Sequence, residues 1–455
     1  MSAVPPPPPL AFPAYRRRAG GASVCAIEGP ERMVEYQRLG SRWLRQDLVA
    51  TAYPEKLLIQ DLLNLVPGVE ALEAAEFRAV ERAAGGADGP GGPGGGTAVG
   101  EEAPVWVADA DLGARTTFGV PGRARWMVSV RSDSEVRAVL AQRAAMDPVP
   151  PLLVLGGGSN LLLHSDWDGL VMKMEVPGKT VRPTGAGWAE GVAGAGERWH
   201  DWVDWTLTEG WAGLENLAWI PGSVGAAPMQ NIGAYGVELK DVFAWLEAIR
   251  IEDGALRRFQ PADCRFGYRE SVFKGPERGR WIITRVAFRL QDATSVEPSA
   301  LRVQYGAVEQ ELAAVPRDQW TPRHVADAVI RIRQSKLPDP QVLGNAGSFF
   351  KNPVISATQF ADLQARFPDI AHHIQPDGQA KLAAAWLIER AGWKGHNRVT
   401  HGVHDRQALV LVNRGGATGA QIWELAQDIR KDVLSQYGVE LEPEVNQVGA
   451  TPGSR

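Results

Sequence analysis

The chain has 455 residues, of which 44% are apolar and 22% are charged, and its formal net charge is −5. This composition is ordinary for a soluble globular protein of two or three domains, and it excludes a strongly basic nucleic-acid-binding protein. The two cysteines, Cys25 and Cys264, lie far apart, which argues against a disulfide scaffold and a structural zinc site. No run of about 18 apolar residues predicts a membrane helix, and the prolines at Pro5–Pro9 do not suit a signal peptide. We therefore expect a cytoplasmic protein that binds no metal, no nucleic acid and no membrane.

Residues 1–104 are predicted to be an extension of the core fold that is largely disordered and contains short helices. Residues 85–96 are almost entirely Gly, Pro and Ala, which is typical of a linker. Helices are predicted to begin at Pro54 and at Val69. A partner-recruiting arm, a disordered tail and the product of an upstream start codon all remain open for this region.

After this linker, short strands and helices alternate. Trp126–Val130 is predicted to be a strand, and Asp133 or Ser134 is predicted to cap the helix that follows it. A second strand is predicted at Gly169–Met174. A helix then runs through Trp199, Val203 and Leu207 and is expected to end at Gly210. This alternation indicates a mixed fold of helices and strands.

The last third of the chain carries clear helix signals. Thr321 and the proline after it begin one predicted helix. Ser356–Gln359 and Thr418–Gln421 each have the spacing of a capping box, and the second helix is expected to end at Gly438. Ala408–Asn413 is predicted to be a buried strand because all but its last residue are apolar.

The chain is organised around the run Leu153–Leu163, an apolar strand that breaks into three glycines and a polar pair. Gly156, Gly157 and Gly158 allow the backbone to approach a ligand closely, and Ser159 and Asn160 add side-chain hydrogen bonds. Successive N–H groups in such a turn can converge on an anion. By composition the run is therefore a phosphate cradle, although a glycine-rich turn between two strands, taken alone, is more often only a turn.

The stretch Gly213–Leu239 is too rich in glycine and proline for a regular element and too apolar for a solvated loop. A buried irregular segment leaves backbone N–H and C=O groups that need partners. A large ligand with polar and aromatic groups would supply them. A tightly packed loop that satisfies its own turns is the alternative.

Arg269, Ser348 and Glu444 are candidate residues for chemistry, but spacing along the chain does not join them. Taken singly, they are better explained as a surface salt-bridge partner, a turn hydroxyl and a solvated charge. No Ser-His-Asp spacing, HExxH motif or GxxxxGK[ST] motif is present.

Six motifs taken together resemble the bacterial UDP-N-acetylenolpyruvoylglucosamine reductases, in family order from about Leu112 to Gly449. They are the cradle, the segment 220–236 (Ile-Pro-Gly-Ser-Val-Gly to Gln-Asn-Ile-Gly-Ala-Tyr-Gly), 265–271 (Arg-Phe-Gly-Tyr-Arg-Glu-Ser), 336–340 (Lys-Leu-Pro-Asp-Pro), 344–353 (Gly-Asn-Ala-Gly-Ser-Phe-Phe-Lys-Asn-Pro) and 442–445 (Glu-Pro-Glu-Val). The resemblance implies an enzyme with non-covalent FAD and with NADPH as co-substrate. Such an enzyme reduces UDP-GlcNAc-enolpyruvate to UDP-N-acetylmuramate in peptidoglycan synthesis.

The resemblance also implies the fold class and the domains. It predicts an α+β protein with a two-lobed FAD-binding fold of the vanillyl-alcohol-oxidase (PCMH) type over residues 105–337. A smaller α/β substrate-binding domain is predicted over 338–449, with its C-terminal strand returning to the active site, followed by a tail at 450–455. A monomer is expected.

By motif match, Ser348 is implied to protonate carbon 2 after a hydride from flavin N5 reaches carbon 3, and Arg269 and Glu444 to stabilise the intermediate. The implied cofactor-binding residues are Gly156, Gly157, Gly158, Ser159, Asn160, Pro221, Gly222, Ser223, Gly225, Asn231, Gly233, Ala234, Tyr235 and Gly236. The implied substrate-binding residues are Tyr268, Tyr305, Lys336, Asn352, Lys394 and Gln407.

The chain resembles the subclass with a mobile tyrosine lid, marked by Tyr305 and the loop near His373. An aromatic residue is expected close to Gln375, and the chain has His373 and Ile374 there instead. Two other functions compete with the reductase. An oxygen-using flavoprotein oxidase often tethers its flavin through His or Cys, whereas Leu155 precedes this cradle. A non-catalytic UDP-sugar-binding protein would be expected to lose Ser348, Arg269 or Glu444.

Overall fold

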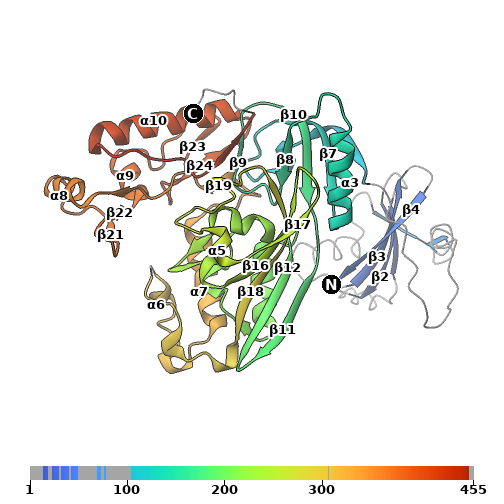
Figure 1. Ribbon diagram of the computed structural model, residues 1–455, viewed down its shortest axis with the longest axis horizontal. Coiled ribbons are helices and arrows are strands. Elements are labelled where there is room, and N and C mark those ends of the chain that lie inside the picture. The colour runs from blue at the N-terminus through green and yellow to red at the C-terminus, as the bar shows by residue number, and fades with distance from the viewer. Residues whose placement is uncertain are drawn as a thin grey trace, which may run out of the picture. The chain divides into compact units, whose positions relative to one another are not determined.

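The computed structural model divides the chain into two compact units, Met1–Val99 and Gly100–Arg455. Figure 1 shows the elements in chain order. The structure describes residues 14–18, 23–29, 32–39, 42–49, 69–72, 76–77, 104–305 and 307–449.

The first unit contains a five-stranded antiparallel sheet in the order β4-β3-β2-β1-β5. Its strands are β1 (Ala14–Arg18), β2 (Ser23–Gly29), β3 (Arg32–Leu39), β4 (Arg42–Val49) and β5 (Val69–Ala71). Val24, Tyr36 and Phe77 are buried, and the rings of Tyr36 and Phe77 meet edge to face with centroids 5.6 Å apart. The unit therefore has an apolar core of its own.

This sheet corrects the expectation of a largely disordered extension. The apolar run Val24–Ile27 is buried in the centre of the sheet, and pairing with β1 and β3 satisfies its backbone. The helix predicted from Val69 begins instead with β5, which pairs with β1. Strands gain their stability from partners distant along the chain, which the local sequence pattern does not reveal. The proposed helix at Pro54 and the linker 85–96 lie outside the described residues.

The second unit begins with a four-stranded sheet in the order β6-β7-β10-β8. The elements are β6 (Trp106–Asp111), β7 (Arg123–Val130), α3 (Asp133–Ala144), β8 (Leu152–Leu155) and β10 (Trp167–Met174). Strands β7, β10 and β8 are parallel, and β6 is antiparallel to β7. Helix α3 buries Val136, Val139 and Leu140, as predicted, but its N-cap is Ser132, whose hydroxyl accepts from the Glu135 N–H at 3.1 Å.

A larger antiparallel sheet follows in the order β11-β12-β18-β16-β17, with β13 beside β18. Its strands are β11 (Lys179–Gly185), β12 (Trp188–Gly194), β13 (Trp211–Ala212), β16 (Phe243–Arg250), β17 (Leu256–Phe259) and β18 (Trp281–Asp292). The helices of this region are α4 (Trp199–Thr208), α5 (Pro261–Cys264), α6 (Val308–Glu311) and α7 (Pro322–Lys336). Helices α4 and α7 bury apolar side chains in one core with this sheet, and Thr321 caps α7 as predicted.

The segment 213–239 is irregular and largely buried. It contains the 3-10 helix η3 (Val224–Gln230) and a two-stranded ribbon of β14 (Gly233–Ala234) and β15 (Val237–Glu238). Asn231 and Tyr235 have positive φ values of 46° and 48°, which few non-glycine residues adopt. The chain therefore follows a specific path here rather than a solvated loop.

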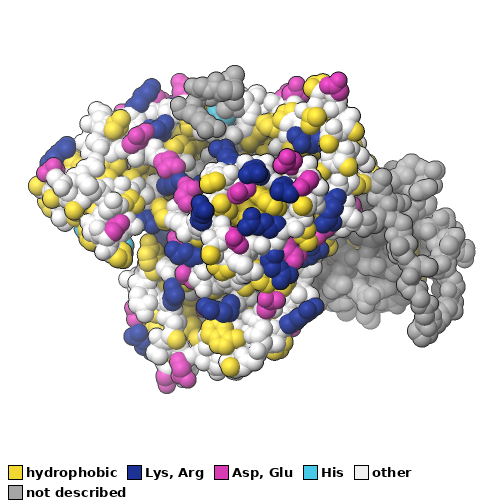
Figure 2. Space-filling model, viewed as in Figure 1, with side chains coloured by type: hydrophobic (Ala, Val, Ile, Leu, Met, Phe, Trp, Pro, Cys, Tyr) yellow, Lys and Arg dark blue, Asp and Glu magenta, His cyan; other side chains and the backbone are white. Residues whose placement is uncertain are grey.

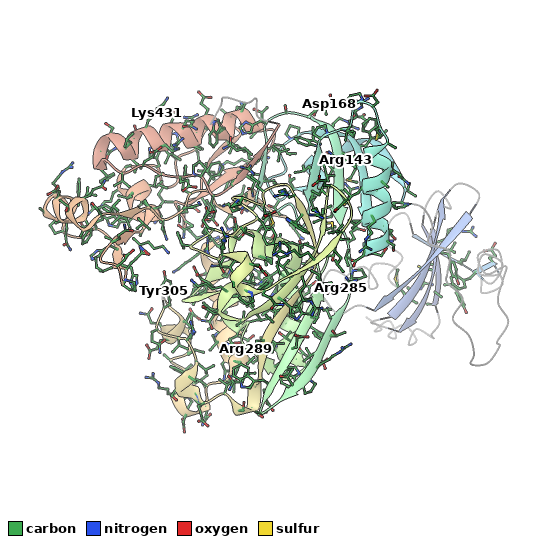
Figure 3. All side chains as sticks on the ribbon, viewed as in Figure 1. Arg143, Asp168, Arg285, Arg289, Tyr305 and Lys431 are labelled. Carbon is green, nitrogen blue, oxygen red and sulfur yellow. The ribbon has the colours of Figure 1, made fainter. Side chains whose placement is uncertain are left out.

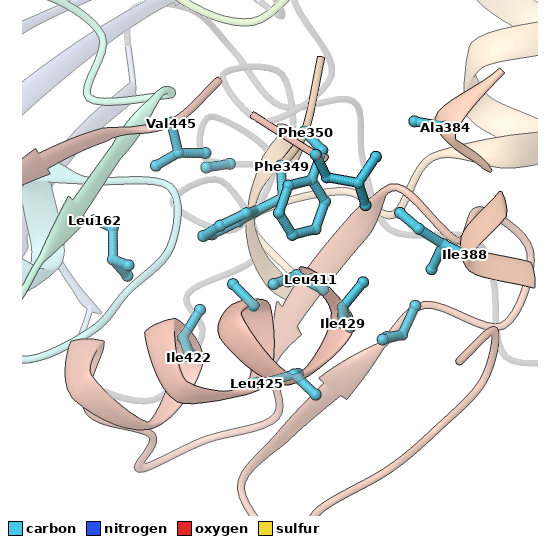
Figure 4. Close-up of a cluster of buried hydrophobic side chains, with 14 of the residues drawn as sticks. Leu162, Phe349, Phe350, Ala384, Ile388, Leu411, Ile422, Leu425, Ile429 and Val445 are labelled. Atoms are coloured by element: carbon cyan, nitrogen blue, oxygen red, sulfur yellow. The ribbon is translucent and has the colours of Figure 1, made fainter. Parts of the chain in front are cut away.

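The C-terminal region has two small sheets and three helices. The strands are β19 (Gly344–Ser348), β20 (Val354–Ile355), β21 (His372–Ile374), β22 (Ala380–Leu382), β23 (His401–Val403) and β24 (Val410–Asn413). The helices are α8 (Ala357–Arg366), α9 (Ala384–Arg390) and α10 (Gly419–Tyr437). The sheet orders are β19-β24-β23 and β20-β22-β21. Figure 4 shows Ile422, Leu425 and Ile429 of α10 facing the core that holds Phe349 and Leu411.

The two capping boxes differ. Thr418 and Gln421 form both hydrogen bonds of a capping box, and Gly438 ends α10 with a φ of 66°. Ser356 caps α8, but the Gln359 side chain donates to the Gly438 carbonyl at 3.1 Å instead of returning to Ser356. The capping box at Ser356 is thus only half formed, because the Gly438 carbonyl lies within reach of the Gln359 side chain.

The chain's last strand returns to the glycine-rich turn. Strand β25 (Asn446–Val448) pairs in parallel with β9 (Leu161–Leu163), which directly follows the cradle. Within the described residues, none of the helices is long and apolar enough to cross a lipid bilayer. On the face in Figure 2, Lys and Arg side chains are interspersed with Asp and Glu over the second unit.

Candidate active site

The glycine cradle is held between two backbone segments that leave no room for side chains. A Cβ on Gly157 would lie 2.8 Å from the Gly222 Cα. Gly158 has a φ of 66°, and a Cβ there would overlap the Arg115 carbonyl. Both positions therefore require glycine, one for close approach and one also for its left-handed backbone.

Polar groups around the cradle have unused hydrogen-bonding capacity. The Ser223 hydroxyl is buried beside Gly156 and has no hydrogen-bond partner among the described residues. The Lys173 ammonium donates to the Gly156 carbonyl, and burial lowers the pKa of Lys173. A buried hydroxyl without a partner costs free energy unless a ligand supplies one. These groups fit the phosphate of a nucleotide cofactor.

A chain of side-chain hydrogen bonds leads from the cradle to Glu444. Asn160 Nδ2 donates to Gln230 Oε1 at 3.0 Å, and Gln230 Nε2 donates to Glu444 Oε1 at 3.3 Å. Asn160 Nδ2 also lies 3.3 Å from the Glu444 carbonyl oxygen. The predicted cofactor-binding turn and the predicted catalytic carboxylate therefore belong to one network.

Arg269, which follows α5, forms an ion pair with Glu444 of the C-terminal region. Arg269 Nε lies 3.1 Å from Glu444 Oε1, and the two side chains are only 19% and 12% exposed. Arg269 Nη2 also donates to the Gly233 carbonyl at 2.8 Å, and Arg269 has a φ of 55°. Burial raises the pKa of Glu444, and the positive charge of Arg269 opposes that shift. Left-handed backbone at a non-glycine residue is typical of functional sites.

Ser348 lies at the end of β19 and is exposed. The next residue, Phe349, accepts a backbone hydrogen bond from the Glu444 N–H at 2.8 Å, and Phe350 forms a β-bridge with Pro443. The strand carrying Ser348 therefore runs beside the segment carrying Glu444. The structure brings Arg269 and Glu444 into contact and places Ser348 on the adjoining segment.

Lys351 is buried between two carboxylates. Its ammonium lies 2.6 Å from Glu442 Oε1 and 2.9 Å from Glu270 Oε1. Burial alone would lower the pKa of Lys351, but the hydrogen bonds to Glu442 and Glu270 outweigh it and raise the pKa. Lys351 is therefore committed to a structural ion pair.

Arg333 of α7 enters the same region and is absent from the predicted site. Its Nε donates to the Trp219 carbonyl at 3.0 Å, its guanidinium hydrogen-bonds to Tyr235, and burial lowers its pKa. The predicted substrate residue Lys336 lies one helical turn further along α7. That i, i+3 spacing is the sequence signal that points to Arg333.

Tyr268 connects the two sides of the site. Its hydroxyl is hydrogen-bonded by the Asn352 backbone, and burial raises its pKa. The Lys381 ammonium lies over the Tyr268 ring, 3.2 Å from the ring centroid. The central carbon of the Arg269 guanidinium lies 5.4 Å from the same centroid. Lys381 is a second residue that the sequence analysis missed, although it is a lone lysine between two apolar residues of β22.

The remaining predicted substrate residues stay apart from the ion pair. Tyr305 is 59% exposed, packs beside Gly236, and lies on the segment before α6 (Figure 3). Lys394 pairs with Glu389 at 2.8 Å. The Gln407 side chain accepts from the Leu409 N–H at 3.3 Å. In the described part of the chain, no hydrogen bond or ion pair joins these three side chains to Arg269 or Glu444.

A cavity of about 580 Å³ opens beside the cradle. It is lined by Gly113–Gly119, Gly157, Pro340–Gly344 and Asn413–Gly415. Its walls thus come from both the cradle region and the C-terminal region. Arg269, Ser348 and Glu444 are not among the described residues that line it.

Two family models match the second unit. An FAD binding domain matches residues 124–260, and the C-terminal domain of UDP-N-acetylenolpyruvoylglucosamine reductase matches residues 339–448. The first match covers the cradle and the 220–236 segment, and it agrees with the glycine-dependent, phosphate-compatible geometry found there. The chain therefore contains an FAD-binding domain.

Curated relatives match over nearly their whole length. The UDP-N-acetylenolpyruvoylglucosamine reductases of Pseudomonas fluorescens and Azoarcus are 53% and 52% identical to this chain. The matches cover 73% and 74% of this chain and 95% and 96% of the relatives. The crystal structure of the Thermus caldophilus enzyme has a TM-score of 0.51 at 24% identity and covers 76% of this chain and 98% of its own.

The structural likeness and the FAD-binding match confirm the predicted α+β fold with an FAD-binding domain. Identity above one half over nearly the full length of the relatives is far beyond what a shared fold alone produces. The chain belongs to the UDP-N-acetylenolpyruvoylglucosamine reductase family.

Proposed function

We propose that this enzyme uses NADPH to reduce UDP-GlcNAc-enolpyruvate to UDP-N-acetylmuramate, a precursor of peptidoglycan. The single observation that carries the proposal is the buried Arg269–Glu444 ion pair, linked through Gln230 to Asn160 of the cradle. It couples a cofactor turn to a charged site suited to an anionic substrate. Family membership and the motif order support the same reaction.

The cradle would hold the diphosphate of FAD through its backbone N–H groups, with the Ser223 hydroxyl and the Lys173 ammonium nearby. The remaining predicted cofactor residues of segment 220–236 would enclose the rest of the molecule. When bound, FAD supplies the hydride that it receives from NADPH.

Arg269 would bind the carboxylate of the enolpyruvyl group. A planar guanidinium pairs with a carboxylate in two parallel hydrogen bonds, and this neutralises charge that otherwise makes the vinyl group resist hydride attack. Glu444 would orient the guanidinium through the 3.1 Å contact. Negative charge that develops after hydride addition is then stabilised by groups already in position, and removing one such donor typically costs about 10²–10³ in rate.

Ser348 would deliver the proton to carbon 2. Its position on the segment beside Glu444 supports this role, because a weak acid must lie close to the carbanion to transfer its proton. Lys351 is held by Glu442 and Glu270, and the Asn352 Oδ1 accepts from the Ala384 N–H at 3.0 Å, so the Asn352 side-chain NH₂ would be the group that assists the hydroxyl. Glu444, whose pKa burial raises, is the alternative proton source.

Purified protein tests the proposal directly. Heat-released flavin should be FAD at about one per chain, and NADPH oxidation under nitrogen should require UDP-GlcNAc-enolpyruvate. Rapid NADPH oxidation that consumes oxygen without the sugar nucleotide would favour an oxidase instead. Binding of UDP-GlcNAc-enolpyruvate without turnover would favour a non-catalytic binding protein.

A further inference from the structure

Lys381 occupies the central strand of the sheet β20-β22-β21, between the buried residues Ala380 and Leu382. The Lys381 ammonium lies 3.2 Å from the centroid of the Tyr268 ring. Tyr268 precedes Arg269 in the region before α7, whereas β22 belongs to the C-terminal region. The contact therefore joins two parts of the second unit next to the Arg269–Glu444 pair.

The charges around Lys381 leave it without a carboxylate partner. Arg269, Glu238 and Glu444 all act on it electrostatically. Glu238 is paired with Lys240 at 2.8 Å, and Glu444 is paired with Arg269. Among the described residues, no acidic side chain lies within 4.0 Å of the Lys381 ammonium.

Other titratable groups near Lys381 belong to neighbouring elements. His373 of β21 is exposed and pairs with Lys381 of the neighbouring strand β22. Tyr268 lies beneath the ammonium, and burial raises its pKa. Burial and the charge of Arg269 lower the pKa of Lys381 to about 8. A partly buried cation held only by an aromatic face can exchange that weak contact for a ligand anion.

We propose that Lys381 is a further substrate-binding residue whose ammonium, together with the Arg269 guanidinium, holds the carboxylate of the enolpyruvyl group. The Tyr268 ring keeps the ammonium in place when the site is empty of ligand. This inference rests on the proposed function, in which Arg269 binds the carboxylate, and it adds Lys381 as a second cation at that carboxylate.

Two ligands that differ in the carboxylate test the inference. UDP-N-acetylmuramate carries the lactyl carboxylate, and UDP-N-acetylglucosamine lacks it but has the same diphosphate. Binding of each to the oxidised holoenzyme is measured by isothermal titration calorimetry. Lys381→Met should weaken UDP-N-acetylmuramate about 10- to 100-fold and leave UDP-N-acetylglucosamine within about twofold, since a hydrogen bond between charged groups is lost.

Lys431→Met is the matched control, because Lys431 is exposed on α10 (Figure 3) and this variant should bind both ligands as the wild type does. FAD content and the urea unfolding midpoint show whether Lys381→Met is folded. Equal weakening of both ligands would assign Lys381 to the diphosphate and overturn the inference, as would no weakening. Failure of wild-type enzyme to bind UDP-N-acetylmuramate would instead overturn the proposed function.

The pH dependence gives a second test. Lys381 loses its positive charge as pH rises through about 8, so wild-type affinity for UDP-N-acetylmuramate should fall above that pH. Lys381→Arg keeps its charge and should bind the same ligand with little change from pH 7 to 9, because arginine stays protonated there. Glu238, Glu444, Tyr268 and His373 are all retained in this variant. An unchanged alkaline fall in Lys381→Arg would overturn the inference and implicate one of those groups.

Discussion

At the scale of single residues, the site combines a buried ion pair with an exposed hydroxyl. Arg269 and Glu444 are largely shielded from water, whereas Ser348 is accessible at the end of β19. This asymmetry suits a two-step reaction in which charge is stabilised by fixed groups and a proton is delivered separately. The residues of the two steps can therefore be distinguished by experiment.

Ser348→Ala should separate the half-reactions. Reduction of bound FAD by NADPH needs no proton from Ser348 and should proceed at a near-normal rate. Reoxidation by UDP-GlcNAc-enolpyruvate should slow by at least about 10³-fold, because the positioned acid that delivers the proton is lost. Stopped-flow absorbance at the flavin band measures each half. If Ser348→Ala slows both half-reactions equally, or slows neither, Ser348 has a structural role. The proton donor would then be Glu444 or water.

Gly157 offers a test of the cradle. In Gly157→Val, the new Cβ would lie 2.8 Å from the Gly222 Cα, so one backbone segment must move and the diphosphate loses its approach. We expect the purified variant to contain well under a tenth of the wild-type FAD. Gly275→Ala is the control, since that glycine has no positive φ, a Cβ there would lie no closer than 3.9 Å to its neighbours, and it lies outside the predicted site. Stoichiometric FAD in Gly157→Val would contradict the cradle assignment.

At the scale of elements, α10 and β25 join the C-terminal region to the rest of the second unit. The helix buries Ile422, Leu425 and Ile429 against the core that includes Phe349, directly after Ser348. Strand β25 pairs with β9, directly after the cradle. The stability of these elements therefore bears on how Ser348, Glu444 and the cradle are held together.

Thr418→Ala should remove the hydrogen bond that the Thr418 hydroxyl accepts from the Gln421 N–H at the start of α10, whereas the Thr418 N–H can still donate to Gln421 Oε1. The expected loss in free energy of unfolding is about 1 kcal/mol, the usual value for an N-cap hydroxyl. Urea unfolding followed by circular dichroism measures it. Thr418→Ser keeps the acceptor and should stay within about 0.5 kcal/mol of the wild type. An equal loss in both variants would show that packing of the threonine methyl group, and not capping, matters here.

At the scale of the whole molecule, both family-model matches and all the predicted site residues lie in the second unit. The family models match residues 124–260 and 339–448, and relatives covered to 95% match only 73% of this chain. The first unit has its own sheet and its own apolar core. It carries none of the predicted site residues.

Deletion of residues 1–99 should therefore leave FAD content and turnover within about twofold of the full chain, because a compact domain tolerates the loss of a segment outside its core. FAD is quantified by absorbance after heat release, and turnover by NADPH oxidation with the sugar nucleotide. A collapse of either quantity would show that the first unit supports the catalytic part.

Features that depend on local pattern could be predicted from the amino-acid sequence alone. Thr321, Thr418 and Gly438 marked helix ends correctly, because capping involves residues a few positions apart. The glycine cradle was recognisable because only glycine tolerates such close backbone approach. Several motifs in order led to the family, and their specificity comes from the number of positions that agree.

Features that depend on partners distant along the chain could be seen only in the folded protein. Glu444 meets Arg269 because β25 carries the C-terminal segment back to the cradle, a pairing between residues that sequence spacing does not relate. Lys381 joins the site because β22 places it over Tyr268, and Lys351 leaves it because Glu270 and Glu442 enclose its charge. The N-terminal sheet escaped prediction for the same reason, since strands gain their stability from partners elsewhere in the chain while helix caps are local.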